Sequence, residues 1–255
     1  RTYDENGNEI TLQDANGNSK ECVYDEQNNM IRVQDDSGTV TTLEYDENNQ
    51  IISAENGQQE GIHIRYNDRN QVTETIDQNG AVTSYAYNDA GQVLARTDSA
   101  GTTAYTYAGR DMIRTTDPSG AVTEIQYDAA GQVTEIRDGY GVLQSCRYDR
   151  LGRVVEKTNA AGGTITYTYY IHGNIHTVTD PSGGVTTYEY NDNGWLERVR
   201  EPDGGSLSYT LNAEGWITAV TDSLGRTRSY EYDSTGNIVT ETDPEGNQTR
   251  YTYDG

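Results

Sequence analysis

Two closely spaced histidines are the first residues in this chain whose types suggest chemistry. His172 and His176 stand four residues apart, a spacing that on a helix presents two imidazoles to one metal ion. Here they flank Gly173, at a turn and the start of a predicted strand, and His63 is far away. No Glu stands at the spacing of a zinc protease. We therefore expect solvated turn residues at this place and no metal site.

Carboxylates are abundant, with 41 Asp and Glu residues in 255. Their Asp-x-Asn-Gly spacing matches neither the EF-hand loop nor the Gly-Gly-x-Gly-x-Asp nonapeptide that binds calcium. They recur along the whole chain and do not gather in one segment, which favours turn capping over a catalytic pair in one cleft. The sequence accordingly predicts no enzyme, no metal and no cofactor.

Two tryptophans form the most distinctive departure from the local pattern. Trp195 and Trp216 occupy the same place in adjacent repeats, where other repeats carry polar residues such as Gln92 and Gln132. An otherwise polar column is expected to face solvent, so the two rings, about 10 Å apart by strand spacing, predict an exposed aromatic patch. The alternative is that each ring packs across a neighbouring turn or the end of the sheet.

A second aromatic departure lies nearby in the sequence. Tyr169-Tyr170-Ile171 stands where most repeats have Tyr-Asp, next to His172. We therefore take as a candidate patch for a glycan or a protein partner the residues Trp195, Trp216, Tyr169, Tyr170 and His172.

These residues are carried by a tyrosine-anchored repeat, 21 residues long apart from two 20-residue steps. A fixed period of this length marks an array in which each unit buries its apolar face by stacking on its neighbours. The period runs from end to end without a linker, which predicts one continuous array over 1–255. Leu211 stands at one anchor position, and the others are Tyr3, Tyr24, Tyr45, Tyr66, Tyr87, Tyr107, Tyr127, Tyr148, Tyr169, Tyr190, Tyr232 and Tyr253.

Each repeat contains two turn signals of the form Asp/Asn-x-x-Gly, starting one and eleven residues after the anchor. Segments 233–236 and 243–246 are examples. Asp at the first position caps the turn, Pro suits the second, and Gly at the fourth takes the left-handed conformation. Together these residues predict type I turns with a G1 bulge.

The segments between turns are about six residues long and rich in Thr, Val, Ile and Tyr, which favours strands. Thr83, Tyr85 and Tyr87 alternate with other residues, as expected for antiparallel strands with one tyrosine face. Ile175 and Val178 are three apart, which indicates either a bulge or apolar contacts on both faces. The prediction is an all-β antiparallel hairpin array of about 12 repeats, two strands each, forming a curved, spiralling sheet or a segment of a hollow shell.

The amino-acid composition limits the classes of partner that the chain is expected to bind. The formal charge is −23 and the lysines are Lys20 and Lys157, which disfavours nucleic acid and anionic membrane surfaces. No apolar run approaches the roughly 18 residues of a membrane span. Only 33% of residues are hydrophobic, but the 21 tyrosines supply a packed face. Cys22 and Cys146 both lie two residues before an anchor and are expected to be buried thiols, not a disulfide.

The pattern Tyr-Asp-x-x-Gly, then an apolar residue, then Asp-Pro-x-Gly and a Thr-x-Tyr strand, resembles the YD-repeat of the RHS family. Segment 148–154, Tyr-Asp-Arg-Leu-Gly-Arg-Val, is close to that consensus, and the resemblance covers the whole chain. Early repeats depart from it: Asn28, Asn49 and Asn70 replace the first-turn Gly, and segment 55–61 scrambles one second turn. Asn tolerates the left-handed conformation, so we expect these first turns to be kept.

The resemblance implies a function. RHS and YD-repeat proteins include bacterial polymorphic toxins, shell components of insecticidal toxin complexes, secreted effectors, wall-associated proteins and teneurins. In them, repeats form a spiralling sheet around a polypeptide cargo or support adhesion modules. We expect a non-enzymatic wall segment of a secreted or cell-surface protein that contacts cargo and flanking repeats. The alternative is a carbohydrate- or receptor-binding module. Exposed edge strands predict self-association of the isolated chain.

Overall fold

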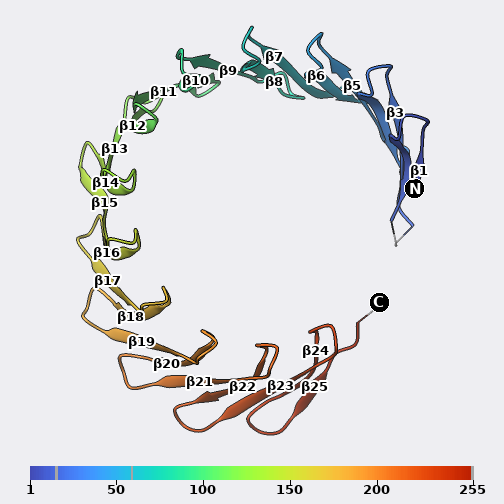
Figure 1. Cartoon of the computed structure of the whole chain (residues 1–255). Coiled ribbons are helices and arrows are strands. Elements are labelled where there is room, and N and C mark those ends of the chain that lie inside the picture. The colour runs from blue at the N-terminus through green and yellow to red at the C-terminus, as the bar shows by residue number, and fades with distance from the viewer. Residues whose placement is uncertain (15–16, 59, 254–255) are drawn as a thin grey trace. The chain divides into compact units, whose positions relative to one another are not determined.

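The computed structural model describes residues 1–14, 17–58 and 60–253 and is all-β over these residues, with antiparallel pairing throughout. The chain divides into two compact units, Arg1–Glu124 and Ile125–Gly255. Figure 1 shows each unit as a succession of hairpins. The prediction of a single array over 1–255 stays a prediction.

The strands of the first unit follow the predicted six-residue segments between turns. They are β1 (Thr2–Tyr3), β2 (Glu9–Gln13), β3 (Ser19–Tyr24), β4 (Met30–Asp35), β5 (Val40–Tyr45), β6 (Ile51–Asn56), β7 (Gly61–Tyr66), β8 (Val72–Ile76), β9 (Val82–Tyr87), β10 (Val93–Asp98), β11 (Gly101–Ala108) and β12 (Asp111–Thr116).

One strand, β13 (Val122–Tyr127), contains the division between the units. The second unit continues the same pattern with β14 (Val133–Asp138), β15 (Gly141–Tyr148), β16 (Val154–Asn159), β17 (Thr164–Tyr169), β18 (Ile175–Thr179), β19 (Val185–Tyr190), β20 (Leu196–Arg200), β21 (Ser206–Leu211), β22 (Ile217–Asp222), β23 (Thr227–Tyr232), β24 (Ile238–Thr242) and β25 (Gln248–Arg250).

A bulge that follows the anchor resolves the three-residue spacing of the second strand, as the β17–β18 hairpin shows. In the β17–β18 hairpin, Tyr167 lies opposite Val178 and Tyr169 lies opposite Ile175, with a register shift between them that leaves His176 extra. Directly opposed residues share a face of the sheet. The bulge therefore places Ile175 and Val178 together on the tyrosine face, and apolar contacts on both faces are not required.

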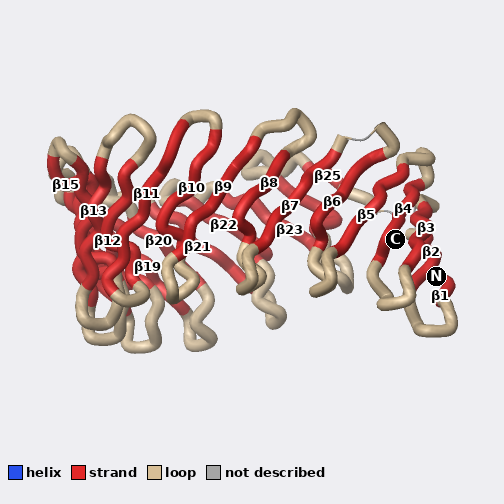
Figure 2. Tube along the Cα trace, turned by 90° about the horizontal axis from the view of Figure 1, so that it is seen from above, coloured by secondary structure: helices blue, strands red, loops and turns tan. Residues whose placement is uncertain are grey.

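The turns have the predicted chemistry. In the turn at Asp233, the Gly236 N–H donates to the Asp233 carbonyl (3.2 Å) and the Asp233 N–H donates to the Asn237 carbonyl (2.9 Å). Gly236 has a φ of 90°. This is the type I turn with a left-handed glycine, and Figure 2 shows such loops gathered at the two edges of the strand layer within each unit.

The turns whose sequences depart from the consensus keep the same backbone conformation. The substituted first-turn residues Asn28, Asn49 and Asn70 have φ values of 66°, 61° and 61°, which confirms the expected left-handed conformation. In segment 55–61, the Asn56 carboxamide oxygen takes the capping role of Asp and accepts from the N–H groups of Gln58 (2.9 Å) and Glu60 (3.0 Å). Predicted turn residues Ala15, Asn16 and Gln59, and the terminal Asp254 and Gly255, lie outside the described residues.

Shortened turns occur in both 20-residue repeats. In the first, only Ser99 and Ala100 lie between the paired residues Asp98 and Gly101. In the second, only Gly109 and Arg110 lie between the paired residues Ala108 and Asp111.

Within each unit the strands form a single layer (Figure 1), and few side chains are enclosed. Among the described residues, those that count as buried are Cys146, Val199, Ser53 and Thr240, and no described side chain is completely covered. Cys22 is half-buried, and both cysteines are free thiols. Stability therefore comes from strand ladders and contacts between neighbouring repeats, with no central core.

The anchor hydroxyls connect successive repeats. Each of the following anchors donates a hydrogen bond from its hydroxyl to the backbone carbonyl 15 residues earlier, at the start of the bulged strand of the preceding repeat. The pairs are Tyr24 to Glu9 (3.1 Å), Tyr45 to Met30 (2.8 Å), Tyr66 to Ile51 (2.9 Å), Tyr87 to Val72 (2.7 Å), Tyr148 to Val133 (2.8 Å), Tyr169 to Val154 (2.6 Å), Tyr232 to Ile217 (2.6 Å) and Tyr253 to Ile238 (2.9 Å).

Candidate functional site

The first turns, which directly follow the anchors, form the edge that carries the predicted aromatic patch. In the turn at Asp149, the carboxylate Oδ1 accepts from the N–H groups of Leu151 (2.8 Å) and Arg153 (3.0 Å). The Arg153 N–H, together with its guanidinium and the Leu151 N–H, holds the pKa of Asp149 below its usual range. Asp in these turns is thus a structural cap.

The turn that begins at Tyr170 is built without this cap. Its backbone still closes, because the Tyr170 N–H donates to the Asn174 carbonyl (2.9 Å) and the Gly173 N–H donates to the Tyr170 carbonyl (3.0 Å). The tyrosine side chain instead reaches the next repeat, where its hydroxyl donates to the Tyr188 carbonyl (3.1 Å). Its ring makes an edge contact with Tyr190, at 5.9 Å between centroids.

A hollow of about 730 Å³ opens between this turn and the next first turn, 191–194. Tyr170, Tyr190 and Asn191 are among the residues that line it, and the exposed His172 lies on the turn side. The other imidazole, His176, packs against the Tyr170 ring at 4.5 Å between centroids. We call this space the Tyr170 hollow; its lining residues are Tyr170, Ile171, His172, Asn174, Glu189, Tyr190, Asn191, Asp192, Asn193 and Gly194.

A second hollow, of about 420 Å³, lies on the other side of the same turn and contains Trp195. Asn191 and Asn193 line both hollows, so the two spaces adjoin. Leu211, the one non-tyrosine anchor, also lines the Trp195 hollow. The structure thus brings Tyr170, His172 and Trp195 to neighbouring positions on one edge.

Trp195 and Trp216 are half-buried, as are most other residues of their column, which differs from the solvent-facing column expected from its polar composition. Each ring lies over the first-turn glycine of the next repeat: a Cβ built on Gly215 would lie 3.0 Å from the Trp195 ring, and one on Gly236 would lie 3.0 Å from the Trp216 ring. Trp216 also packs against the anchor Tyr232 at 5.2 Å between centroids. Packing across a neighbouring turn is therefore the observed arrangement.

Tyr169 does not join the hollow as a lining residue. Its hydroxyl is engaged with the Val154 carbonyl, and the Arg153 guanidinium lies 4.4 Å from its ring centroid. Burial raises the pKa of Tyr169 above its usual value. Arg153 was not expected from the sequence; its place in the same column as the tryptophans was the available signal.

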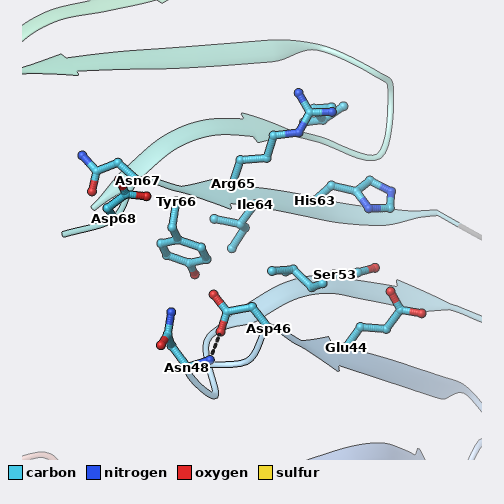
Figure 3. Close-up of a pocket in the computed structure, with 12 residues that line it drawn as sticks. Glu44, Asp46, Asn48, Ser53, His63, Ile64, Arg65, Tyr66, Asn67 and Asp68 are labelled. Carbon is cyan, nitrogen blue, oxygen red and sulfur yellow. Dashed lines mark hydrogen bonds between the residues drawn. The ribbon is translucent and has the colours of Figure 1, made fainter. Parts of the chain in front are cut away.

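A hollow of about 650 Å³ in the first unit is the counterpart of the Tyr170 hollow, at turns that keep the usual polar residue after the anchor (Figure 3). It lies beside the turns that follow β5 and β7, and in the figure the Tyr66 ring points toward the turn that holds Asp46 and Asn48. The Asp46 carboxylate is occupied as a cap by the Asn48 N–H (2.9 Å). Here Asp46 holds the turn position that Tyr170 has in the second unit.

Within 1–14, 17–58 and 60–253, no group of three or more His, Cys, Asp or Glu side chains is arranged to hold a metal ion. The same part of the chain has no helix long and apolar enough to cross a membrane.

Comparison with known families accounts for most of the chain. The RHS Repeat family matches residues 24–59, 66–103, 212–248 and 232–255, and the Teneurin YD-shell family matches residues 114–214. The chain belongs to the RHS/YD-repeat family. Its tyrosine-anchored hairpins are YD repeats of the type that builds structural shells. No curated protein sequence matches the chain.

Solved structures share the fold of this YD-repeat chain. The TcdB2-TccC3-TEV and TcdB2-TccC3-Cdc42 crystal structures each superpose with a TM-score of 0.73 at 15% identity, and the Photorhabdus luminescens Tc holotoxin pore with a TM-score of 0.74 at 15% identity. Each match covers 96% of this chain and 16% of the other. The chain therefore has the fold of an RHS/YD shell and spans a small part of those chains.

Proposed function

We propose that this YD-repeat chain is a non-enzymatic wall segment of a β-shell that encloses a polypeptide cargo. The single observation that carries the proposal is the combination of shell-type repeats with a sheet of one layer in which no described side chain is completely enclosed. A sheet without a core of its own is suited to act as a barrier between two spaces. The mechanism is steric, and it requires no reacting group.

The internal contacts support a stiff wall. The anchor hydroxyls bond successive repeats, as Tyr66 does with Ile51 (2.9 Å), and the bulged β17–β18 hairpin keeps Tyr167 and Tyr169 on one face. Ion pairs brace the other face, as between Arg147 and Glu156 (2.9 Å). Such exposed pairs contribute modestly, so the hydrogen-bonded ladder carries most of the stiffness.

Partners and location follow from the same proposal. The outer strands β1 and β25 each pair with one neighbour among the described strands, which leaves an edge for flanking repeats of the same protein. In isolation these edges promote self-association. The matches to toxin-complex and teneurin shells support an extracellular destination in general terms, which we propose here as secreted or cell-surface.

Limited proteolysis of the complete gene product that contains this chain tests the proposal. We expect a protected polypeptide to be released when the wall is opened by deletion of one strand, residues 206–211, because the loss of β21 breaks the antiparallel order. Deletion of a whole repeat, residues 212–232, preserves the order and is the matched control. Digestion of all segments at equal rates in the intact protein would contradict enclosure.

A further inference from the structure

We propose that the first-turn edge of the second unit binds a second copy of this chain, with a two-fold axis at turn 170–173. This inference is independent of the shell function, because it concerns the turns at one edge and applies whether or not a cargo is enclosed. It also differs from association through the end strands β1 and β25, since every contact is made by turns of one unit. The edge consists of five consecutive first turns, which begin at Asp128, Asp149, Tyr170, Asn191 and Asn212.

These five turns share one backbone conformation and are connected to one another. Their fourth-position glycines have φ values between 78° and 99°. The side chain after the glycine reaches the next turn, as in the hydrogen bonds from Gln132 to the Gly152 carbonyl (2.9 Å) and from Asn174 to the Gly194 carbonyl (3.2 Å). The second and third residues of each turn, which we call its tip, therefore form a row with a constant spacing of about 10 Å, two strands per repeat.

Apolar side chains are uncovered near the middle of this row. Ile171 is 89% exposed and Leu151 is 74% exposed, and they lie at the tips of adjacent turns. The Asp149 carboxylate next to them is used as a cap by the Leu151 N–H (2.8 Å) and is paired with Arg153 (2.6 Å). Exposed apolar side chains that lie together among polar residues are typical of surfaces that contact another protein.

The charges at the tips make the row complementary to itself. The second residues of the five turns are, in chain order, Ala129, Arg150, Ile171, Asp192 and Ala213. A two-fold axis perpendicular to the sheet at turn 170–173 reverses the order of the turns in the second copy, and two-fold symmetry is the commonest symmetry of homo-oligomers. The turn with Arg150 then faces the turn with Asp192 of the second copy, twice by symmetry, while turn 170–173 faces its own counterpart.

Both charges are available for this contact. Arg150 and Asp192 are exposed, and neither forms an ion pair with a described residue of its own chain. The repeats between these two turns are of equal length, so the remaining turns come into register when one pair of turns meets. The uncharged tips at Ala129 then face those at Ala213 of the second copy.

The first unit lacks this self-complementarity. Arg69 compensates one carboxylate of its row, through the pair with Asp89 (3.7 Å). Each of its first five turns nevertheless carries a carboxylate at the second position: Glu5, Glu26, Glu47, Asp68 and Asp89. Two such rows repel each other, because like charges face each other in any register. In a chain with a formal charge of −23, the edge that pairs opposite charges is therefore the favoured contact between copies.

The contact is small, so the dimer is weak. The tips of a few turns cover less than the roughly 1,200–2,000 Å² that stable complexes bury. Exposed ion pairs add little affinity, so the pairs between Arg150 and Asp192 mainly fix the register and the orientation of the two copies. We expect a dissociation constant on the order of 0.1–1 mM for the parent chain.

Sedimentation velocity of the full chain and of two charge-reversed variants tests the proposal. Arg150→Asp and Asp192→Arg each place like charges at both contacts of a homodimer, so we expect each variant alone to dimerise about tenfold more weakly than the parent chain. An equimolar mixture of the two variants places opposite charges at both contacts. We expect the parent affinity to return in a heterodimer, which a fluorescent label on one variant detects.

A second pair of variants tests the apolar centre of the contact. Ile171→Ser removes the most exposed side chain at the axis without touching the backbone bonds of its turn, and it should weaken dimerisation about tenfold. Leu224→Ser is the matched control, because Leu224 is 77% exposed but lies on a second turn, and it should leave dimerisation unchanged.

Three results would overturn the proposal. A mixture of the charge-reversed variants that associates no more tightly than either variant alone would exclude the pairing of Arg150 with Asp192. Association that is unchanged in Arg150→Asp, Asp192→Arg and Ile171→Ser would assign the contact to the end strands β1 and β25. A parent chain that stays monomeric up to about 2 mM would show that the edge does not bind a second copy.

Discussion

In the first unit, amide side chains connect successive first turns. In the second unit, aromatic rings take this place at some of the turns. Gln71 donates from Nε2 to the Gly91 carbonyl (3.3 Å), whereas Trp195 lays its ring over Gly215. In both cases a Cβ on the glycine would lie 3.0 Å from the neighbouring side chain. In both units, the first-turn glycine leaves space for a side chain from the preceding repeat. Either a flexible amide or a rigid ring can occupy this space.

Substitution of the two glycines by alanine gives the largest predicted difference between the units. Gly91 and Gly215 have φ values of 83° and 86°, so the strain of a left-handed alanine is the same at both. Gly91→Ala is expected to cost about 1–2 kcal/mol, because the end of Gln71 can move away. Gly215→Ala is expected to cost about 2–4 kcal/mol, because the Trp195 ring resists displacement. Urea denaturation with hydrogen exchange of the local amides measures both.

A double variant separates ring crowding from backbone strain. Trp195→Gln combined with Gly215→Ala should reduce the cost to that of Gly91→Ala, since the amide restores the arrangement of the first unit. An unchanged cost in the double variant would show that the Trp195 ring is not the obstacle.

Exchange of anchor residues gives an intermediate effect of opposite sign in the two units. Tyr66→Phe removes the hydroxyl that bonds the Ile51 carbonyl (2.9 Å) and should cost about 1 kcal/mol. Leu211→Tyr adds the missing hydroxyl opposite the Leu196 carbonyl and should stabilise by up to about 1 kcal/mol. The Trp216–Tyr232 contact shows that a tryptophan and a tyrosine anchor fit side by side. Thermal unfolding of the two variants tests this, and a neutral Tyr66→Phe would contradict it.

Acid is expected to produce the smallest effect, confined to single turns. The folded pKa of Asp149, like that of Asp4 in the first unit, is lowered by hydrogen bonds to its turn. The contribution of the cap is therefore fully present above the unfolded Asp pKa of about 3.9 and is lost as pH falls through the lowered folded value. Amide NMR signals of Leu151 and Arg153 should titrate below about pH 4, while the Asn174 amide, whose turn lacks the carboxylate, should not. Equal titration of all three would refute the difference in capping.

The repeat made most of the fold predictable from local sequence. Asp-x-x-Gly and its Asn variants specify turns through short-range chemistry, which is why Asn49 takes the left-handed conformation as expected. The sequence does not decide between a bulge and contacts on both faces, because the answer depends on the partner strand. Only the pairing of Tyr169 with Ile175 shows which face Ile175 occupies. The local sequence pattern therefore predicts the turns and strands, whereas the pairing register determines which face of the sheet a side chain occupies.

Contacts between repeats were less predictable. The tyrosine period showed that the anchors matter, but the 15-residue reach of the Tyr66 hydroxyl to Ile51 depends on how hairpins stack. The half-buried tryptophan column likewise depends on a glycine in the next repeat, which composition alone does not connect to Trp195. The structure also divides the predicted patch, with Tyr170 and His172 in one hollow, Trp195 in the next, and Trp216 one repeat further.

The direction of the anchor bonds has a consequence for biosynthesis. In each of the anchor bonds, the acceptor carbonyl precedes its tyrosine in the chain, as Val133 precedes Tyr148. A ribosome therefore releases the acceptor before the donor, and each new hairpin finds its docking site already made. This order of the hydrogen bonds, together with pairing between consecutive strands, lets the polypeptide fold in the order of translation. Each hairpin can form before the sequence that follows it has been made.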